Sequence, residues 1–69
     1  MDYEVFRAAV SETLQAVAGP MTWTEIRTAA RLPQLFPNNQ WVRRLETDIR
    51  LERDRDEHGI IHWRLTPDA

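Results

Sequence analysis

The chain has 69 residues, a formal net charge of −2 and no cysteine. This length allows one domain at most, and such a small domain buries only roughly 60% of the surface of its unfolded chain. Because neither a disulfide nor a thiolate zinc site is available, apolar packing must hold the fold, and 42% of the residues are hydrophobic. All the basic residues are arginine, and the slightly acidic balance argues against an interface that depends on overall positive charge.

Several functional classes are disfavoured by what the sequence lacks. No apolar stretch approaches the roughly 20 residues of a membrane span, and the acidic start does not resemble a signal peptide, so we expect a cytoplasmic protein without membrane contact. The two glycines, Gly19 and Gly59, form no phosphate-binding motif, and the single serine, Ser11, lies in no nucleophile motif. We therefore expect no enzyme, no catalytic residue, no cofactor and no small-molecule substrate, since so short a chain does not easily enclose a pocket.

The first segment has the spacing of an amphipathic helix over residues of about 2–18. Its apolar residues recur at steps of three and four, which places them on one face. They are Tyr3, Phe6, Val10, Leu14 and Val17. Asp2 and Glu4 suit the positive end of the helix dipole. Gly19 and Pro20 form a natural stop for this helix.

The next segment predicts a short helix over about 23–31, followed by a connector. Thr22–Glu25 has the pattern of a capping box, in which the first and last side chains bond each other's backbone amides. Pro33 ends this helix. Three residues of the connector, Leu32, Leu35 and Phe36, are too apolar for a free loop, so we expect them to pack on the core.

A third helix is predicted over about 38–48, with Asn38 as its N-cap. One of its sides is apolar and carries Trp41, Val42, Leu45 and Ile49. The three tryptophans of the chain lie in different predicted elements, and we expect them to be mutual partners in the core.

Alternation of apolar and polar residues then predicts a β-hairpin over about 49–55 and 60–65. A type I turn over Asp56–Gly59 sets the register, because aspartate favours its first position and glycine its last. The resulting cross-strand pairs are Leu51–Leu65, Glu52–Arg64, Arg53–Trp63, Asp54–His62 and Arg55–Ile61. The histidines near this turn lack a closed ligand geometry, so we expect no metal site. Residues 67–69 are expected to form a frayed tail.

Three helices followed by a hairpin resemble the winged helix-turn-helix DNA-binding superfamily. The resemblance covers residues 1–66 as one domain and is carried by Thr22–Glu25, Asn38–Thr47 and the Gly59 turn. It implies an α+β fold that is mostly helical, with a C-terminal two-stranded hairpin as the wing. Pro20–Thr22 offers one or two residues for the short extra strand that such domains often carry. The implied function is that of a small transcriptional regulator whose third helix reads the major groove of double-stranded DNA.

The outward side of the third helix supplies the candidate DNA-contacting residues. With Trp41 turned to the core, helical geometry points Gln40, Arg43 and Thr47 directly away from it. Asn39, Arg44 and Arg50 flank this stripe. Arginine, asparagine, glutamine and threonine are the side chains that read base edges in the major groove, although the same types are also common as solvated residues at helix starts.

Further contacts are implied by the resemblance. Arg27 and Arg31 share one face of the second helix, which in this architecture crosses the phosphate backbone. Arg53 and Arg55 lie on the wing, where arginine suits a narrow minor groove. The same four arginines are equally compatible with a role as solvated or paired surface charges.

Charge counting limits the expected strength of DNA binding. Residues 38–65 hold six arginines and six acids, so their charges cancel. We therefore expect a shallow salt dependence, with roughly three to five phosphate contacts. A homodimer, or attachment to a larger assembly, would compensate for the modest affinity of one copy. The alternative is a protein–protein interaction module, or an adaptor domain of a larger complex, that uses the same helices without touching DNA.

Overall fold

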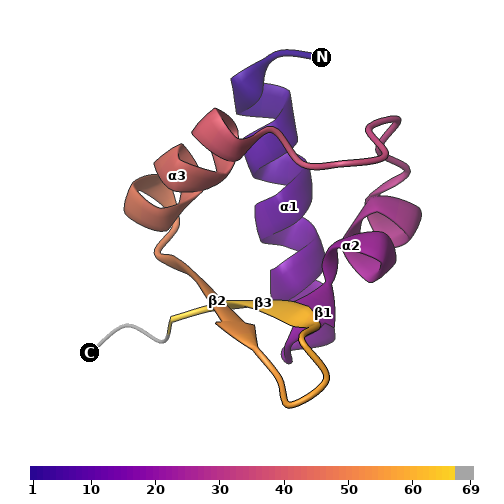
Figure 1. The fold of residues 1–69 in the computed structure, drawn as a ribbon. Coiled ribbons are helices and arrows are strands. Elements are labelled where there is room, and N and C mark those ends of the chain that lie inside the picture. The colour runs from indigo at the N-terminus through magenta and orange to yellow at the C-terminus, as the bar shows by residue number, and fades with distance from the viewer. Residues whose placement is uncertain (67–69) are drawn as a thin grey trace.

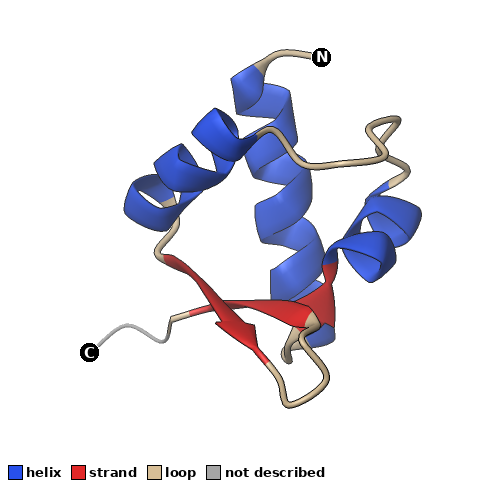
Figure 2. Cartoon of the chain, in the orientation of Figure 1, coloured by secondary structure: helices blue, strands red, loops and turns tan. Residues whose placement is uncertain are grey.

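The computed structural model describes residues 1–66, and the tail expected at 67–69 lies outside the described residues. Within them the fold is α+β, with an antiparallel sheet at one end of the molecule and the helices above it in the view of Figure 1 and Figure 2. The elements in chain order are α1 (Tyr3–Val17), β1 (Met21–Thr22), α2 (Trp23–Ala30), α3 (Asn39–Asp48), β2 (Leu51–Arg55) and β3 (Ile61–Leu65). None of these helices has the length and apolar character needed to span a membrane.

Capping interactions with the backbone fix both ends of helix α1. The Asp2 side chain accepts a hydrogen bond from the Val5 amide at 2.9 Å, which satisfies a backbone donor of the first turn. At the other end, the left-handed residue is Ala18, with φ of 56°, and its amide donates to the Leu14 carbonyl at 3.1 Å. The left-handed residue that ends the helix is therefore one position before the predicted glycine stop. An alanine takes the left-handed conformation, which glycine adopts without steric cost.

Side-chain caps fix the starts of α2 and α3, as the sequence predicts. Thr22 Oγ1 accepts from the Glu25 amide at 3.2 Å, and Glu25 Oε1 accepts from the Thr22 amide at 2.9 Å, which completes the capping box. Asn38 Oδ1 accepts from the amides of Gln40 and Trp41, at 2.9 and 3.2 Å. Both helices thus begin within a residue of their predicted positions.

The sheet has three strands in the order β1-β3-β2, so the prediction of a two-stranded wing was wrong. The extra strand is the short Met21–Thr22 segment, which pairs with Trp63 and His62 of β3. The register between β2 and β3 is the predicted one, from Leu51–Leu65 to Arg55–Ile61. Gly59 has φ of 80° and its amide donates to the Asp56 carbonyl at 3.0 Å, which closes the hairpin turn.

The core lies where α1, α2, α3 and the sheet meet. Its largest fully buried side chains are Trp63, Phe6, Ile26, Leu45, Val10 and Val42. The expected mutual packing of the tryptophans is present only in part: Trp23 stacks on Trp63 at 5.3 Å between ring centroids, whereas Trp41 packs on Phe6 at 5.2 Å. Trp23 and Trp41 are only partly buried, whereas Trp63 is 1% exposed.

The connector between α2 and α3 contradicts one prediction. Leu32 is buried, but Leu35 is 68% and Phe36 82% exposed, so these two do not pack on the core. Hydrogen bonds to the backbone of the connector explain this exposure. The carbonyl oxygens of Gln34 and Leu35 accept hydrogen bonds from Arg27 Nε and Trp23 Nε1, at 2.8 and 2.9 Å. With both carbonyls tied to α2, the side chains of Leu35 and Phe36 turn to solvent.

Candidate nucleic-acid interface

Helix α3 has one buried face and one exposed face. Val42 and Leu45 are 0% exposed and fix the rotation of the helix against the core. Gln40, Arg43 and Thr47 are exposed on the outer side, where helical geometry had placed them. In the part of the chain that the structure describes, no carboxylate oxygen lies within 4 Å of Arg43. Its guanidinium therefore remains available for a ligand.

The residues that flank this stripe have individual roles. Asn39 is exposed at the first position of α3. Arg44 lies with its guanidinium carbon 3.8 Å from the centroid of the Tyr3 ring, a cation–π geometry that holds the side chain at the boundary between α1 and α3. Arg50 follows the helix with φ of 55°, and its carbonyl accepts hydrogen bonds from the amide and hydroxyl of Thr66. Arg50 thus connects α3 to the end of β3.

Tyr3 is the residue that joins α1 to the end of α3. Its hydroxyl donates to Asp48 Oδ2 at 2.6 Å, and the residue is 6% exposed. Burial, together with the hydrogen bond to Asp48 and its negative charge, raises the pKa of Tyr3 to about 12. Sequence reasoning placed Tyr3 only in the core, since a contact across 45 positions leaves no local signal in the sequence.

Arg27 within α2 and Arg31 at its C-cap do not act as an equivalent pair. Arg27 is half-buried and uses Nε to hold the Gln34 carbonyl, so it has a structural role in the connector. Arg31 is exposed and ends α2 with φ of 56°. Of the two, Arg31 has the guanidinium that is freer to reach a phosphate.

The arginines of the hairpin also differ from each other. Arg53 lies 5.7 Å from the Trp63 ring centroid, as the register predicts, and Nη2 approaches Glu46 Oε1 at 3.9 Å. Arg55 is exposed near the turn. Arg53 is therefore partly committed to internal contacts, and Arg55 is the more accessible cation of the hairpin.

At the turn, the Asp56 carboxylate is bound internally. His62 Nε2 lies 2.9 Å from Asp56 Oδ2, and this contact, with hydrogen bonds from the backbone amides of Ile60 and His58, lowers the pKa of Asp56. Among residues 1–66, no three His, Asp or Glu side chains gather closely enough to hold a metal ion.

Charge is distributed unevenly along the chain, and this feature was missed by the count over residues 38–65. From Ile26 to Leu45 there are four arginines and no Asp or Glu, so this stretch carries +4. The rest of the chain then carries −6, since the whole carries −2. The count over residues 38–65 combined α3 with the acidic hairpin, so the positive charge of α3 was cancelled by the acids of the hairpin. A count over α2, the connector and most of α3 finds it from sequence alone.

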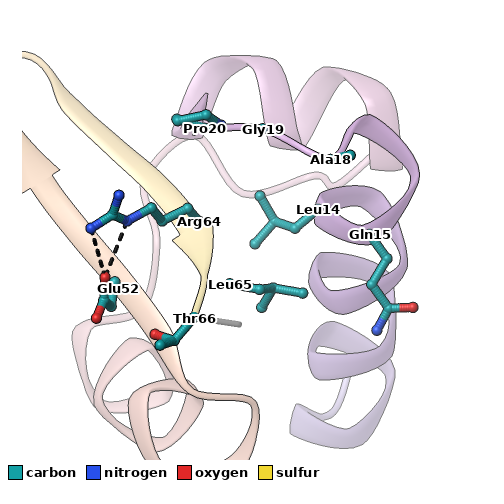
Figure 3. Close-up of a pocket in the computed structure, with 9 residues that line it drawn as sticks. All are labelled: Leu14, Gln15, Ala18, Gly19, Pro20, Glu52, Arg64, Leu65 and Thr66. Atoms are coloured by element: carbon teal, nitrogen blue, oxygen red, sulfur yellow. Dashed lines mark hydrogen bonds and ion pairs between the residues drawn. The ribbon is translucent and has the colours of Figure 1, made fainter. Parts of the chain in front are cut away.

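A hollow lies on another part of the surface (Figure 3). It is an open groove of about 650 Å³ between the end of α1 and the hairpin. Its apolar floor includes Leu14 and Leu65, and its charged residues, Glu52 and Arg64, pair with each other at 2.8 Å. Because those charges are mutually neutralised, the groove is a weaker candidate for ligand recognition than α3.

Comparison with models of known protein families, with curated proteins and with solved structures found no match to the chain. Function must therefore be inferred from the geometry and charge of the chain itself.

Proposed function

We propose that the chain is a winged helix-turn-helix domain that binds double-stranded DNA, with α3 in the major groove and the β2–β3 hairpin as the wing. In this arrangement α2 crosses the phosphate backbone, and β1 joins the start of α2 to the sheet. The biological role that fits best is a small transcriptional regulator.

The charge segregation carries the proposal. The stretch from Ile26 to Leu45 is free of acids and includes the accessible cations Arg31, Arg43 and Arg44, although the chain as a whole is acidic. A polyanion would be attracted more strongly to this stretch than to the rest of the chain, which orients the approach. The neighbouring Asn39 and Gln40 add neutral groups suited to adenine edges.

The exposure and the internal contacts of each arginine determine what it is expected to contribute to DNA affinity. Arg43 is the best candidate for a bidentate contact to guanine, because it is exposed and lies on the outer stripe of α3. Arg31 and Arg55 are candidates for phosphate contacts, and so is Arg44, which is exposed although its guanidinium stacks on Tyr3. Arg27 and Arg53 are partly committed to polar internal partners, the Gln34 carbonyl and Glu46. With roughly three to four phosphates contacted, the slope of log K against log salt would be about −3, which corresponds to modest affinity for one copy.

The test is fluorescence anisotropy with a labelled duplex of mixed sequence over a salt series. Arg43→Ala is expected to weaken binding by about tenfold, in the range for losing one base contact. Arg64→Ala is the matched control, because it removes the same charge from an arginine already paired with Glu52 and Asp54. Equal effects of the two variants, or no binding at low salt, would exclude α3 as the DNA-contacting element.

Protein binding by the same domain is the second candidate. The specific observation in its favour is the exposed apolar pair in the connector, Leu35 and Phe36, since contiguous exposed apolar side chains mark interaction sites. The two functions are compatible, because the pair belongs to the connector and the reading face belongs to α3.

A further inference from the structure

The exposed stripe of α3 carries two side chains that have no polar partner inside the protein. Gln40 and Arg43 are exposed, and among residues 1–66 neither the Gln40 side-chain amide nor the Arg43 guanidinium has a hydrogen bond or an ion pair. The two residues lie three positions apart, so they project from the same side of the helix, about 4.5 Å apart along its axis. Both side chains can therefore contact one external surface together.

The core and the N-cap fix the direction in which these two side chains project. Val42 and Leu45 are 0% exposed, which sets the rotation of α3 about its axis. Asn38 Oδ1 accepts from the amides of Gln40 and Trp41 at 2.9 and 3.2 Å, which sets the position of the first turn. Base edges are recognised by hydrogen bonds of defined geometry, and a backbone fixed in advance loses little conformational freedom when such bonds form.

The polar residues next to this pair are placed less well for reading bases. The Arg44 guanidinium carbon lies 3.8 Å from the centroid of the Tyr3 ring, so this arginine is held against α1. Asn39 precedes Gln40 by one position, which turns its side chain by about 100° around the helix axis. Gln40 and Arg43 are thus the two long polar side chains that share the outer side of α3 and are not held by another residue.

We propose that the domain recognises a two-base step of adenine and guanine on one DNA strand, with Gln40 on the adenine and Arg43 on the guanine. This inference rests on the proposed function, because it requires α3 to lie in the major groove. There the glutamine amide oxygen accepts from adenine N6 and its nitrogen donates to N7, whereas the guanidinium of arginine donates to O6 and N7 of guanine. Residues about one turn apart on a helix in the major groove contact successive bases, principally on one strand, as in zinc fingers.

Thr47 limits the recognised sequence to these two bases. It is exposed on the same stripe, one further turn after Arg43. Its hydroxyl both donates and accepts, and its methyl group can contact the methyl group of thymine, so it discriminates between bases less than the longer side chains do. The base pair next to the guanine, on the side away from the adenine, should therefore vary among bound sequences.

Selection from a library of duplexes with a randomised centre, followed by sequencing of the bound fraction, tests the proposal. We expect the wild-type chain to favour AG or GA on one strand by about tenfold over steps that lack the guanine. Arg43→Gln should replace guanine by adenine in the preferred step, and Gln40→Arg should replace adenine by guanine. Because both side chains are exposed, circular dichroism should show the wild-type fold for both variants.

Arg44→Gln is the matched control, because it removes the same charge at the next position of the helix. It should weaken binding to all duplexes to a similar extent and leave the preferred step the same, as expected for a phosphate contact. A chain that binds the library without favouring such a step, or whose preference Arg43→Gln leaves unchanged, would overturn this inference and leave the proposed function standing. Failure to bind any duplex of the library at low salt would overturn both.

Discussion

The alkaline stability of this protein should depend on a single side chain, Tyr3. The chain has one tyrosine and neither lysine nor cysteine, so no other side chain ordinarily titrates between about pH 9 and 12. In the folded protein Tyr3 is buried and its hydroxyl donates a hydrogen bond to Asp48, and its pKa is raised to about 12. In the unfolded chain it has the ordinary value of 10.0.

The sign of the effect follows from which state holds the proton more tightly. Below pH 10 Tyr3 is neutral in both states, and its contribution to stability is complete. Between pH 10 and 12 the unfolded chain loses the proton first, so the free energy of unfolding falls as pH rises. The two-unit difference corresponds to roughly 2.7 kcal/mol in full, of which about 1.4 kcal/mol is lost at pH 11.

Urea unfolding followed by tryptophan fluorescence at pH 9 and pH 11 measures this loss. Tyr3→Phe is the control variant: it keeps the ring on which Arg44 stacks but has no proton to lose, so its stability should be the same at both pH values. Absorbance titration of the folded wild type should give a tyrosine midpoint near 12. Equal wild-type stability at both pH values, or the same loss in Tyr3→Phe, would refute the reasoning.

Two further predictions concern the ends of helices. Ala18→Gly should raise the free energy of unfolding by about 0.5 to 1 kcal/mol in urea titrations, because it relieves a left-handed alanine, whereas Ala16→Gly inside α1 should lower it by about 1 kcal/mol. Changes of the same sign would contradict this explanation. Asn38→Ala should cost about 1 kcal/mol of stability and weaken DNA binding in anisotropy assays, because two amides of the first turn of α3 lose their acceptor. Unchanged stability would show that the cap contributes nothing.

The hairpin could be predicted to the level of its register because several local signals agree there. Asp56 and Gly59 fit one turn type, and that turn brings opposite charges together across the strands, as in Glu52 and Arg64. The third strand was harder to predict. Met21 and Thr22 are too few to show alternation, and their pairing depends on Trp63, far away in the sequence.

The connector shows why apolar composition alone does not determine burial. Leu32 and Phe36 are both strongly hydrophobic and only four positions apart, yet one is 4% and the other 82% exposed. What separates them is the direction of the backbone, which is fixed by side-chain donors on α2, namely Arg27 and Trp23. Hydrophobicity patterns contain no information on such bonds.

Part of the candidate site could be predicted from the sequence, and part of it depends on contacts between residues that are distant in the sequence. Exposure of Gln40, Arg43 and Thr47 follows from helical periodicity once the buried side is known, so the sequence sufficed. The different roles of the arginines did not follow, because they depend on partners such as Tyr3 for Arg44 that are distant in sequence. The proposed reading of DNA stays a prediction until binding is measured.

The two-residue ladder between β1 and β3 closes the chain into a ring that contains α2, the connector, α3 and β2. A ligand that requires these helices at one mutual angle would favour the closed ring over its opened form by mass action. Amide hydrogens of the β1–β3 ladder should then exchange more slowly with solvent deuterium when a ligand occupies α3.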